Sequence, residues 1–345
     1  MKRTFDQSNE NIFMQVFKYY KCNNPKPSYE DVIKIENDKL EKKEAIEACN
    51  FQTVAEDNRT TVLGLKPTKE WKTYKFVRHP GLLLIKNPFT SLGQRYWIRK
   101  CLEEYSRKPN KTNIDIDIII SDWWKECFSK EECNVKLQKK LRWTTLGYHH
   151  NWDTKVYSED NKSRFPEDLA ELSDCFAQYL GFKNFKAEAA IVNYYHLGST
   201  LSAHTDHSEI NLEAPLFSFS FGQSAIFLIG GTDKTIEPSA ILLESGDIAV
   251  MSKEARLSYH AIPKIISTSC QPWNNDEAII EINDNIINLK YVTDAEQLVI
   301  DMNRNIDNKE WDLFKCYVEE SRINMNVRQV LYTKQKSLYD LECIK

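Results

Sequence analysis

The stretch His204-Thr205-Asp206 decides the fold, because it sets an imidazole and a carboxylate two residues apart. On a β-strand such residues point to the same face, so both side chains can reach one ion. His260 follows in a later apolar stretch and can complete the set from a second strand. A lone His-x-Asp pair occurs by chance in many proteins, and a single histidine in an apolar stretch is more often a core residue. The metal interpretation therefore depends on the rest of the chain.

A second stretch, Arg322-Ile-Asn-Met-Asn-Val-Arg328, changes these odds. If it is a strand, its apolar residues face one side, and the other side carries Arg322, Asn324, Asn326 and Arg328. A solvated face could carry four polar residues, but it usually favours Lys, Glu and Thr. Two arginines interleaved with two asparagines are instead typical of a site that binds carboxylates through planar, bidentate hydrogen bonds.

Together the two stretches predict an iron-dependent oxygenase. Two histidines and one carboxylate on one side of a metal form the facial triad of non-haem Fe(II) oxygenases, and the ligands here are His204, Asp206 and His260. Such a triad leaves coordination sites open for a bidentate 2-oxo acid and for O2.

The order of these motifs resembles the AlkB family of Fe(II)- and 2-oxoglutarate-dependent nucleic acid dioxygenases. The stretches 141–153, 187–195, 216–228 and 245–248 are similar to the AlkB homologue 1 branch, which is linked to demethylation and oxidation of tRNA bases. The resemblance runs from about residue 12 to residue 335, and so includes an N-terminal segment that most AlkB proteins lack. It implies that Fe(II) is bound, with 2-oxoglutarate and O2 as cosubstrates.

The resemblance also assigns the residues that bind 2-oxoglutarate. Arg322 would bind its distal carboxylate, while Asn193 and Tyr195 match the family's Asn-x-Tyr and would hydrogen-bond it. Arg328 would act in catalysis beside the iron and the 1-carboxylate. Asn324 matches a family asparagine, and Asn326 stands where a threonine is common, so its role stays open.

A basic and aromatic stretch offers contacts for nucleic acid. We expect phosphate contacts and base stacking on an unpaired strand from Lys139, Lys140, Arg142, Trp143, Tyr148 and His150. For any single residue, a core edge or a solvated helix is about equally expected. After the metal aspartate, where the family commonly contacts substrate, stand His207, Ser208 and Glu209.

The implied reaction is oxidative demethylation or hydroxylation of methylated bases. The favoured substrate is tRNA, through removal of N1-methyladenine or oxidation of 5-methylcytosine, and single-stranded or bulged DNA comes second. A base within a helix must first be flipped out or presented in a loop. Two alternatives stay open: a protein or small-molecule hydroxylase on the same fold, and a lyase or binding module that uses no iron.

Composition limits the partners and the compartment. With 345 residues and a net charge of -4, the chain has no overall attraction for polyanions, so nucleic acid must be held by local basic patches. No apolar run is long enough to span a membrane, and no membrane partner is expected. Nine cysteines, an odd number, suggest free thiols inside the cell, with cytoplasm, nucleus and mitochondrion all open. We expect a monomer.

The strand pattern predicts an α+β fold with a mostly β core. After Glu188, short runs that suit strands lie at 189–196, 200–205, 216–221, 224–229, 240–243, 247–252, 256–262 and 322–331. Eight such strands suggest a double-stranded β-helix, the cupin-like jelly roll, buttressed by helices.

The expected domain organisation has two main parts. Residues 1–70 are an N-terminal helical extension and charged linker, in which 11–20 form a helix and 30–48 an exposed helix or linker. Residues 71–345 form the dioxygenase domain. Within it, 136–185 are the nucleic-acid recognition region, 186–335 the jelly-roll core, and 266–276 an insertion loop.

Overall fold

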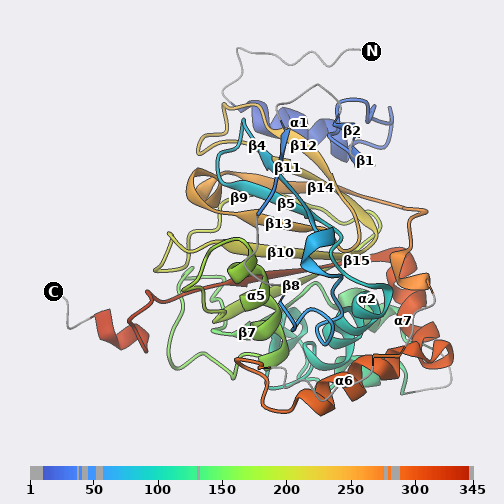
Figure 1. Cartoon of the computed structure of the whole chain (residues 1–345). Helices are drawn as coiled ribbons and strands as arrows, with labels where there is room; N and C mark the ends of the chain where they lie inside the picture. Colours follow the sequence, from blue (N-terminus) through green and yellow to red (C-terminus); the bar gives the residue numbers. More distant parts are fainter. Residues whose placement is uncertain are drawn as a thin grey trace.

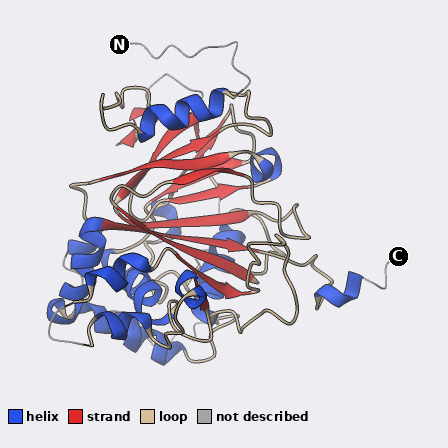
Figure 2. Ribbon diagram, turned by 180° about the vertical axis from the view of Figure 1, so that it is seen from behind, coloured by secondary structure: helices blue, strands red, loops and turns tan. Residues whose placement is uncertain are grey.

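Two β-sheets face each other across a cavity, and helices cover their outer sides (Figure 1, Figure 2). The structure is a computed structural model of the whole chain. It describes residues 11–36, 39–40, 46–51, 57–129, 133–275, 279–280 and 288–341. Within these residues, no helix is both long enough and apolar enough to cross a membrane.

The larger sheet has nine antiparallel strands. Its order from one edge to the other is β3 (Ile46–Cys49), β4 (Lys72–Phe76), β5 (Leu82–Lys86), β13 (Ile248–Met251), β10 (Leu216–Gly222), β15 (Ser321–Arg328), β8 (Ala189–His196), β7 (Trp143–Gly147) and β6 (Lys111–Thr112). The smaller sheet has four strands in the order β12 (Ser239–Leu243), β11 (Ser224–Ile229), β14 (His260–Ile266) and β9 (Leu201–His204).

The predicted jelly roll is confirmed. Along the chain from β8 to β15, four strands go to the larger sheet and four to the smaller one, as a double-stranded β-helix requires. The strands lie close to their predicted positions. The largest difference is at β14, which starts at His260 because the preceding residues Lys253–Leu257 form a 3-10 helix.

Strand β15 shows how the sequence divides the two faces of the larger sheet. Ile323, Met325 and Val327 are buried in the main hydrophobic core on the helical side. Arg322, Asn324 and Asn326 alternate with them and line the cavity between the sheets. The period of two in this segment therefore separates core from site, as predicted.

Helices fill the outer side of the larger sheet. They are α2 (Ser91–Arg99), α3 (Trp123–Cys127), α4 (Val135–Lys140), α5 (Glu167–Tyr179), α6 (Ala295–Asn303) and α7 (Asn308–Glu320). Figure 2 shows them gathered on one side of the strands. Buried residues of α2, α5, α6 and α7 share one core cluster with β8, β10 and β15, so these helices support the strands that carry the site.

The N-terminal helix α1 (Ile12–Lys21) covers the outer face of the smaller sheet (Figure 1). Phe13, Val16, Phe17 and Tyr20 recur at helical spacing and pack against Ile226, Leu228 and Ala261 of that sheet. The helix expected at 11–20 is confirmed. Residues 1–10 lie outside the described residues.

The exposed helix or linker expected at 30–48 is wrong where the chain is described. Residues Ile35–Glu36 (β1) pair with Lys39–Leu40 (β2), and β3 joins the edge of the larger sheet. The Lys/Glu-rich composition suggested a solvated helix. The pairing of Ile46 with Phe76 instead buries the apolar residue of β3 against β4.

The larger sheet also extends outside the span 186–335 predicted for the β core. Strands β3, β4, β5, β7 and β6 all come from earlier in the chain. Strand β7 ends at Gly147, whose positive φ of 68° turns the chain into the loop that follows. A Cβ at Gly147 would lie 2.1 Å from the carbonyl oxygen of Glu188, so this turn needs glycine.

Candidate active site

The three predicted metal ligands meet at one end of the smaller sheet. His204 ends β9, Asp206 follows two residues later, and His260 begins β14. His204 and His260 are register partners, with ring centroids 4.2 Å apart. Possible ligand atoms of the three residues lie within 4.8 Å of one another, so together they could hold a metal ion.

Backbone carbonyls fix which ring nitrogen each histidine presents. His204 Nδ1 donates to the carbonyl of Ser202 at 2.9 Å, and His260 Nδ1 donates to the carbonyl of Ser258 at 3.1 Å. A carbonyl can only accept, so Nδ1 carries the proton and Nε2 is left with its lone pair toward the cluster. This is the arrangement that metal-ligating histidines adopt.

The charges of the cluster also suit a cation. Burial, and then the neighbouring His260, lower the pKa of His204 to about 4, which keeps its imidazole neutral near neutral pH. Burial opposes ionisation of Asp206, but Arg328 and the two histidines hold its pKa well below the usual value. The cluster therefore offers the neutral imidazole of His204 and one carboxylate, beside the ring of His260.

Arg322 provides the test of whether 2-oxoglutarate fits the cavity. Its side chain is 1% exposed, and Nη2 donates to the Ser220 hydroxyl at 2.9 Å. Its Nε and Nη1 have no hydrogen-bond partner among the described residues. Burial lowers the pKa of Arg322 to about 10, although Tyr195 and Asp247 act in the opposite direction. A buried cation with two free donors is costly unless an anion joins it, so the residues fit a dicarboxylate.

The rest of the cavity joins Arg322 to the histidines. Both sheets contribute to its lining, which consists of Tyr195, Leu201, His204, Leu216, Ser218, Phe227, Leu243, Ala249, Met251, His260, Ile262, Arg322, Asn324 and Asn326. The Arg322 guanidinium lies 5.3 Å from the Tyr195 ring. Arg322 and the two histidines of the proposed metal site therefore line the same, mostly apolar cavity.

The other predicted cosubstrate residues lie around this space. Asn193 is on the same face of β8 as Tyr195 and pairs in register with Asn324. Asn324 donates from Nδ2 to the Ser218 hydroxyl at 2.8 Å and to the carbonyl of Phe219 at 2.9 Å. Its amide group is thus fixed by β10 rather than free.

The basic residues of the expected recognition region are exposed. Lys139 and Lys140 end helix α4, and Arg142 precedes β7. Asn113 accepts from the backbone N–H of Arg142 at 2.7 Å and donates to the carbonyl of Lys140 at 2.8 Å. Arg142 also acts electrostatically on Tyr195, which places its charge near the cosubstrate cavity.

The aromatic residues form a cluster beside the triad. The rings of Trp143 and Trp152 are 5.0 Å apart, and those of His150 and Trp152 are 4.7 Å apart. Burial, and then the positive charge of Arg328, lower the pKa of His150 to about 4. Trp152 is 39% exposed and can meet a base from solvent.

Two predicted substrate contacts, Tyr148 and Glu209, need correction. Tyr148 is buried, and its hydroxyl donates to Glu159 at 2.5 Å, so its ring is not free to stack on a base. Glu209 is 4% exposed, and its two carboxylate oxygens pair with Arg256 and Tyr157 at 2.7 Å and 3.0 Å. Both are internal contacts rather than substrate groups.

His207 and Ser208 remain candidates for substrate contact. His207 is exposed, and its Nδ1 lies 3.0 Å from the Thr205 hydroxyl. Ser208 is half-buried. Both follow Asp206 directly, on the loop that leaves the metal cluster.

Sequence reasoning missed Arg256 and Tyr157. Arg256 is 1% exposed and bonds the backbone of Asp206, while Tyr157 bonds Glu209. Arg256 could have been noticed because it is a charged residue, four residues before His260, in a segment that otherwise suits a strand. No local pattern marked Tyr157.

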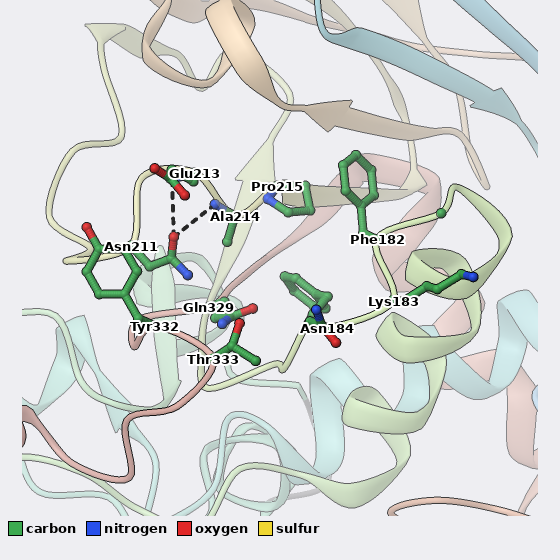
Figure 3. Close-up of a pocket in the computed structure, with 12 residues that line it drawn as sticks. Phe182, Lys183, Asn184, Asn211, Glu213, Ala214, Pro215, Gln329, Tyr332 and Thr333 are labelled. Carbon is green, nitrogen blue, oxygen red and sulfur yellow. Dashed lines mark hydrogen bonds between the residues drawn. The ribbon is translucent and has the colours of Figure 1, made fainter.

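A second, open pocket lies outside the metal cluster (Figure 3). It is lined by Gly181, Phe182, Lys183, Asn184, Phe185, Asn211, Glu213, Ala214, Pro215, Gln329, Tyr332 and Thr333. The pocket contains none of the triad residues. It is bordered by the loop that follows Asp206 and by the segment that follows β15.

Comparisons with known proteins show which family the chain is similar to. The 2OG-Fe(II) oxygenase superfamily matches residues 81–328. The chain is 40% identical over 296 residues to the nucleic acid dioxygenase ALKBH1 of Mus musculus, across 83% of this chain and 73% of that protein. It is 32% identical over 280 residues to the tRNA demethylase abh1 of Schizosaccharomyces pombe, across 75% of this chain and 82% of that protein. The solved structure of OsALKBH1 aligns with 74% of this chain and 99% of its own, at 18% identity and a TM-score of 0.44.

A jelly roll with a His-Asp-His cluster beside a buried arginine that has two donors without a partner in the described part of the chain defines an iron- and 2-oxo-acid-dependent oxygenase. The chain belongs to the 2OG-Fe(II) oxygenase superfamily and, within it, to the AlkB family of dioxygenases. It uses Fe(II), 2-oxoglutarate and O2. The predictions of family, enzyme class and cofactors are confirmed.

Proposed function

We propose that this dioxygenase oxidises methyl groups on nucleic-acid bases, with tRNA as the favoured substrate. The observation that carries the proposal is the cluster of His204, Asp206 and His260, two of which line a cavity that also contains Arg322. An exposed basic and aromatic surface lies near it, since Arg142 acts electrostatically on Tyr195, and Arg328 and Asp206 act on His150. The name of the Schizosaccharomyces pombe relative, a tRNA demethylase, supports the choice of tRNA.

Each residue near the metal has a proposed role. His204, Asp206 and His260 would hold Fe(II), with two Nε2 atoms and one carboxylate oxygen as the available ligand atoms. Arg322 binds the distal carboxylate of 2-oxoglutarate through its unpaired Nε and Nη1, and Tyr195 stacks along this guanidinium. Arg328 orients Asp206 from the other side, through the bond from its Nη2 to Oδ1.

The remaining cosubstrate residues support this binding. Asn193 and Asn324 lie side by side on β8 and β15, and Asn324 is held by Ser218. We propose that both present polar atoms along the cosubstrate. Asn326 lines the same cavity and is an additional polar contact for it.

When bound, iron, 2-oxoglutarate and O2 supply an oxidant that inserts one oxygen atom into a C–H bond, while the other oxygen enters succinate and CO2 is released. A hydroxylated N-methyl group then breaks down to formaldehyde and the free nitrogen. A hydroxylated C5-methyl group stays on the base. The protein's own residues position the methyl group and exclude water from the cavity.

The base is proposed to reach the cavity from the side of Trp143, His150 and Trp152. These rings lie in contact, and His150 is near Arg328 and therefore near the metal cluster. Lys139, Lys140 and Arg142 then contact phosphates, and His207 and Ser208 approach the base from the loop after Asp206. Because the base must leave its stack, loops, bulges and unpaired DNA are better substrates than a duplex.

A hydroxylase acting on a protein or a small molecule is the rival function, since the same iron and cosubstrate residues would serve it. That function gives no role to the exposed basic residues around Trp143. Binding of nucleic acid with a steep salt dependence separates the two functions.

A screen of modified oligonucleotides tests the proposal. The purified protein is incubated with Fe(II), with or without 2-oxoglutarate, and with tRNA stem-loops and unpaired DNA that carry single methylated bases. Mass spectrometry should detect a loss of a methyl group or a gain of one oxygen only when 2-oxoglutarate is present. If succinate is released while the mass of every oligonucleotide stays unchanged, the proposal of a nucleic-acid substrate is wrong.

Two wider properties are part of the proposal. The described chain contributes the whole triad and Arg322 by itself, which supports a monomeric enzyme. Its eight described cysteines are free thiols, which supports a reducing compartment inside the cell.

A further inference from the structure

Arg256 is a buried residue next to the proposed metal ligands, and its guanidinium makes three hydrogen bonds to the loop that begins at Asp206. It lies on the 3-10 helix Lys253–Leu257 and is 1% exposed. Its Nη1 donates to the backbone carbonyl of Asp206 at 2.5 Å, and its Nε donates to the carbonyl of Ala214 at 3.2 Å. Its Nη2 donates to Glu209 Oε2 at 2.7 Å. One guanidinium thus holds both ends of the loop 206–214 and a carboxylate within it.

The far half of this loop is fixed independently. Asn211 Oδ1 accepts from the backbone N–H groups of Glu213 and Ala214 at 3.2 Å, the two bonds drawn in Figure 3. Asn211 Nδ2 donates to the carbonyl of Leu331 at 3.1 Å. Asn211 thus fixes the far half of the loop to the segment after β15. The near half, which begins at Asp206, is held by Arg256.

Glu209 closes these contacts into a ring. Its Oε1 accepts from the Tyr157 hydroxyl at 3.0 Å and lies 3.4 Å from Arg328 Nε. Arg328 Nη2 in turn donates to Asp206 Oδ1 at 2.8 Å. The ring therefore runs from the backbone of Asp206 through Arg256, Glu209 and Arg328 to the side chain of the same aspartate.

The ring is balanced in charge. Two guanidinium groups face two carboxylates, so the formal charges cancel before a metal ion is added. Loss of the Glu209 charge would leave an excess positive charge next to the site that must take up a dication. Coulomb repulsion in this mostly buried setting would then weaken metal binding, even though Glu209 is not one of the proposed ligands.

Tyr157 links the ring to the surface that faces substrate. It lies in the loop that also carries His150 and Trp152, and its ring centroid is 5.7 Å from that of His150. The hydrogen bond from its hydroxyl to Glu209 therefore links the aromatic cluster to the ring of hydrogen bonds around Asp206.

We propose that Arg256 and Glu209 are positioning residues that hold Asp206 and Arg328 in the geometry for metal binding, and that Tyr157 ties the substrate-side loop to them. The inference rests on the proposed function only through the assignment of Asp206 as a metal ligand. It does not depend on which base or nucleic acid is oxidised.

Metal binding without nucleic acid tests the proposal. Metal-free wild type and the variant Glu209→Gln are titrated with Co(II) by calorimetry, and the visible absorption of the Co(II) proteins is compared. Removal of a group that orients a metal ligand costs about 10- to 100-fold in affinity. We expect a decrease in this range, with a shifted absorption spectrum. Glu213→Gln is the matched control, because Glu213 is exposed on the same loop and should leave both readouts unchanged.

A second variant keeps the test decisive if Glu209→Gln lowers the stability of the metal-free protein. Tyr157→Phe removes one hydroxyl and leaves the charges of the two arginines and two carboxylates around Asp206 unchanged. It should weaken Co(II) binding by a smaller factor, about twofold to tenfold. Wild-type affinity and absorption in both Glu209→Gln and Tyr157→Phe would overturn the positioning role. Asp206→Ala, measured in the same series, separates this failure from a failure of the metal assignment itself.

Discussion

Arg328 Nη2 donates to Asp206 Oδ1 at 2.8 Å, while Oδ2 of the same carboxylate faces His260 Nε2 at 3.6 Å. The arginine thus occupies one carboxylate oxygen and leaves the other toward the histidines. Both side chains are mostly buried. The pair explains why Asp206 stays ionised in a buried site, and why its free oxygen points to where a metal would lie.

The first prediction concerns Asp206→Ala. Without the carboxylate, the site loses its one anionic ligand and the buried charge of Arg328 loses its partner, so affinity for Mn(II) or Co(II) should collapse. Calorimetry on the metal-free protein measures it. Asp312→Ala, an exposed site on α7, should bind the metal as wild type does. Unchanged metal affinity in Asp206→Ala would rule out this triad.

The second prediction concerns Arg322→Ala. The charge-assisted hydrogen bond that this variant removes is worth about 1.5–3 kcal/mol, or roughly a 10- to 150-fold higher 2-oxoglutarate requirement. Metal affinity should be retained, because Arg322 does not contact the triad. The dependence of succinate release on 2-oxoglutarate concentration measures the effect, with the exposed Arg304→Ala as control. An unaltered dependence removes Arg322 from this role.

The third prediction concerns stability below neutral pH. Burial, and then the charge of Lys111, lower the pKa of His149 from 6.5 to about 4 in the folded protein. Between these values the unfolded chain takes up a proton that the folded chain does not. His149 therefore costs stability as the pH falls from about 6.5 to about 4.

Urea unfolding of His149→Gln checks this sign. The variant should lose less stability than wild type over the same pH interval, whereas the exposed His207→Gln should follow wild type. An identical pH dependence in wild type and His149→Gln would show that His149 does not titrate as described.

The fourth prediction concerns the basic surface. Replacing Lys139, Lys140 and Arg142 together by Ala should weaken binding of RNA about equally across sequences. It should also lower the slope of log affinity against log salt by up to about 0.7–0.9 for each phosphate that the protein no longer neutralises. Filter binding of a tRNA stem-loop at several salt concentrations measures both quantities.

A control that removes two positive charges lies on the helical side of the larger sheet. Lys309→Ala with Lys315→Ala removes two positive charges from α7, away from the cavity. Per charge removed, this pair should change the slope much less. Equal effects from both sets would mean that nucleic acid reaches the protein by another face.

The sequence predicted the strands that carry the candidate site better than it predicted the outer strands of the larger sheet. Strand β15 was found because its alternation is strict over seven residues, and because sidedness follows directly from a period of two. The spacing of His204 and Asp206 suggested that their side chains meet, and they do so with His260, although β9 ends at His204 and Asp206 lies just beyond it. Strands β4 and β7 were missed because each is short and mixes polar with apolar residues.

Contacts between distant parts of the chain caused the remaining errors. Glu209 looked like a substrate group because it follows the metal aspartate, but its partners Arg256 and Tyr157 come from separate segments. Tyr148 was expected to stack on a base because it belongs to a basic and aromatic stretch, but the chain after the turn at Gly147 buries it, and its hydroxyl bonds Glu159. No local pattern encodes such pairings, because burial depends on where the chain returns.

The most direct measurement follows the methyl group itself. A tRNA stem-loop with a CD3 group on N1-methyladenine or 5-methylcytosine is incubated with wild type or Asp206→Ala, Fe(II) and 2-oxoglutarate. For wild type, we predict that deuterated formaldehyde or the deuterated hydroxymethyl base forms in a one-to-one ratio with substrate-dependent succinate, and that neither forms with Asp206→Ala. Substrate-dependent succinate with the CD3 group intact, or labelled product from Asp206→Ala, would contradict this account.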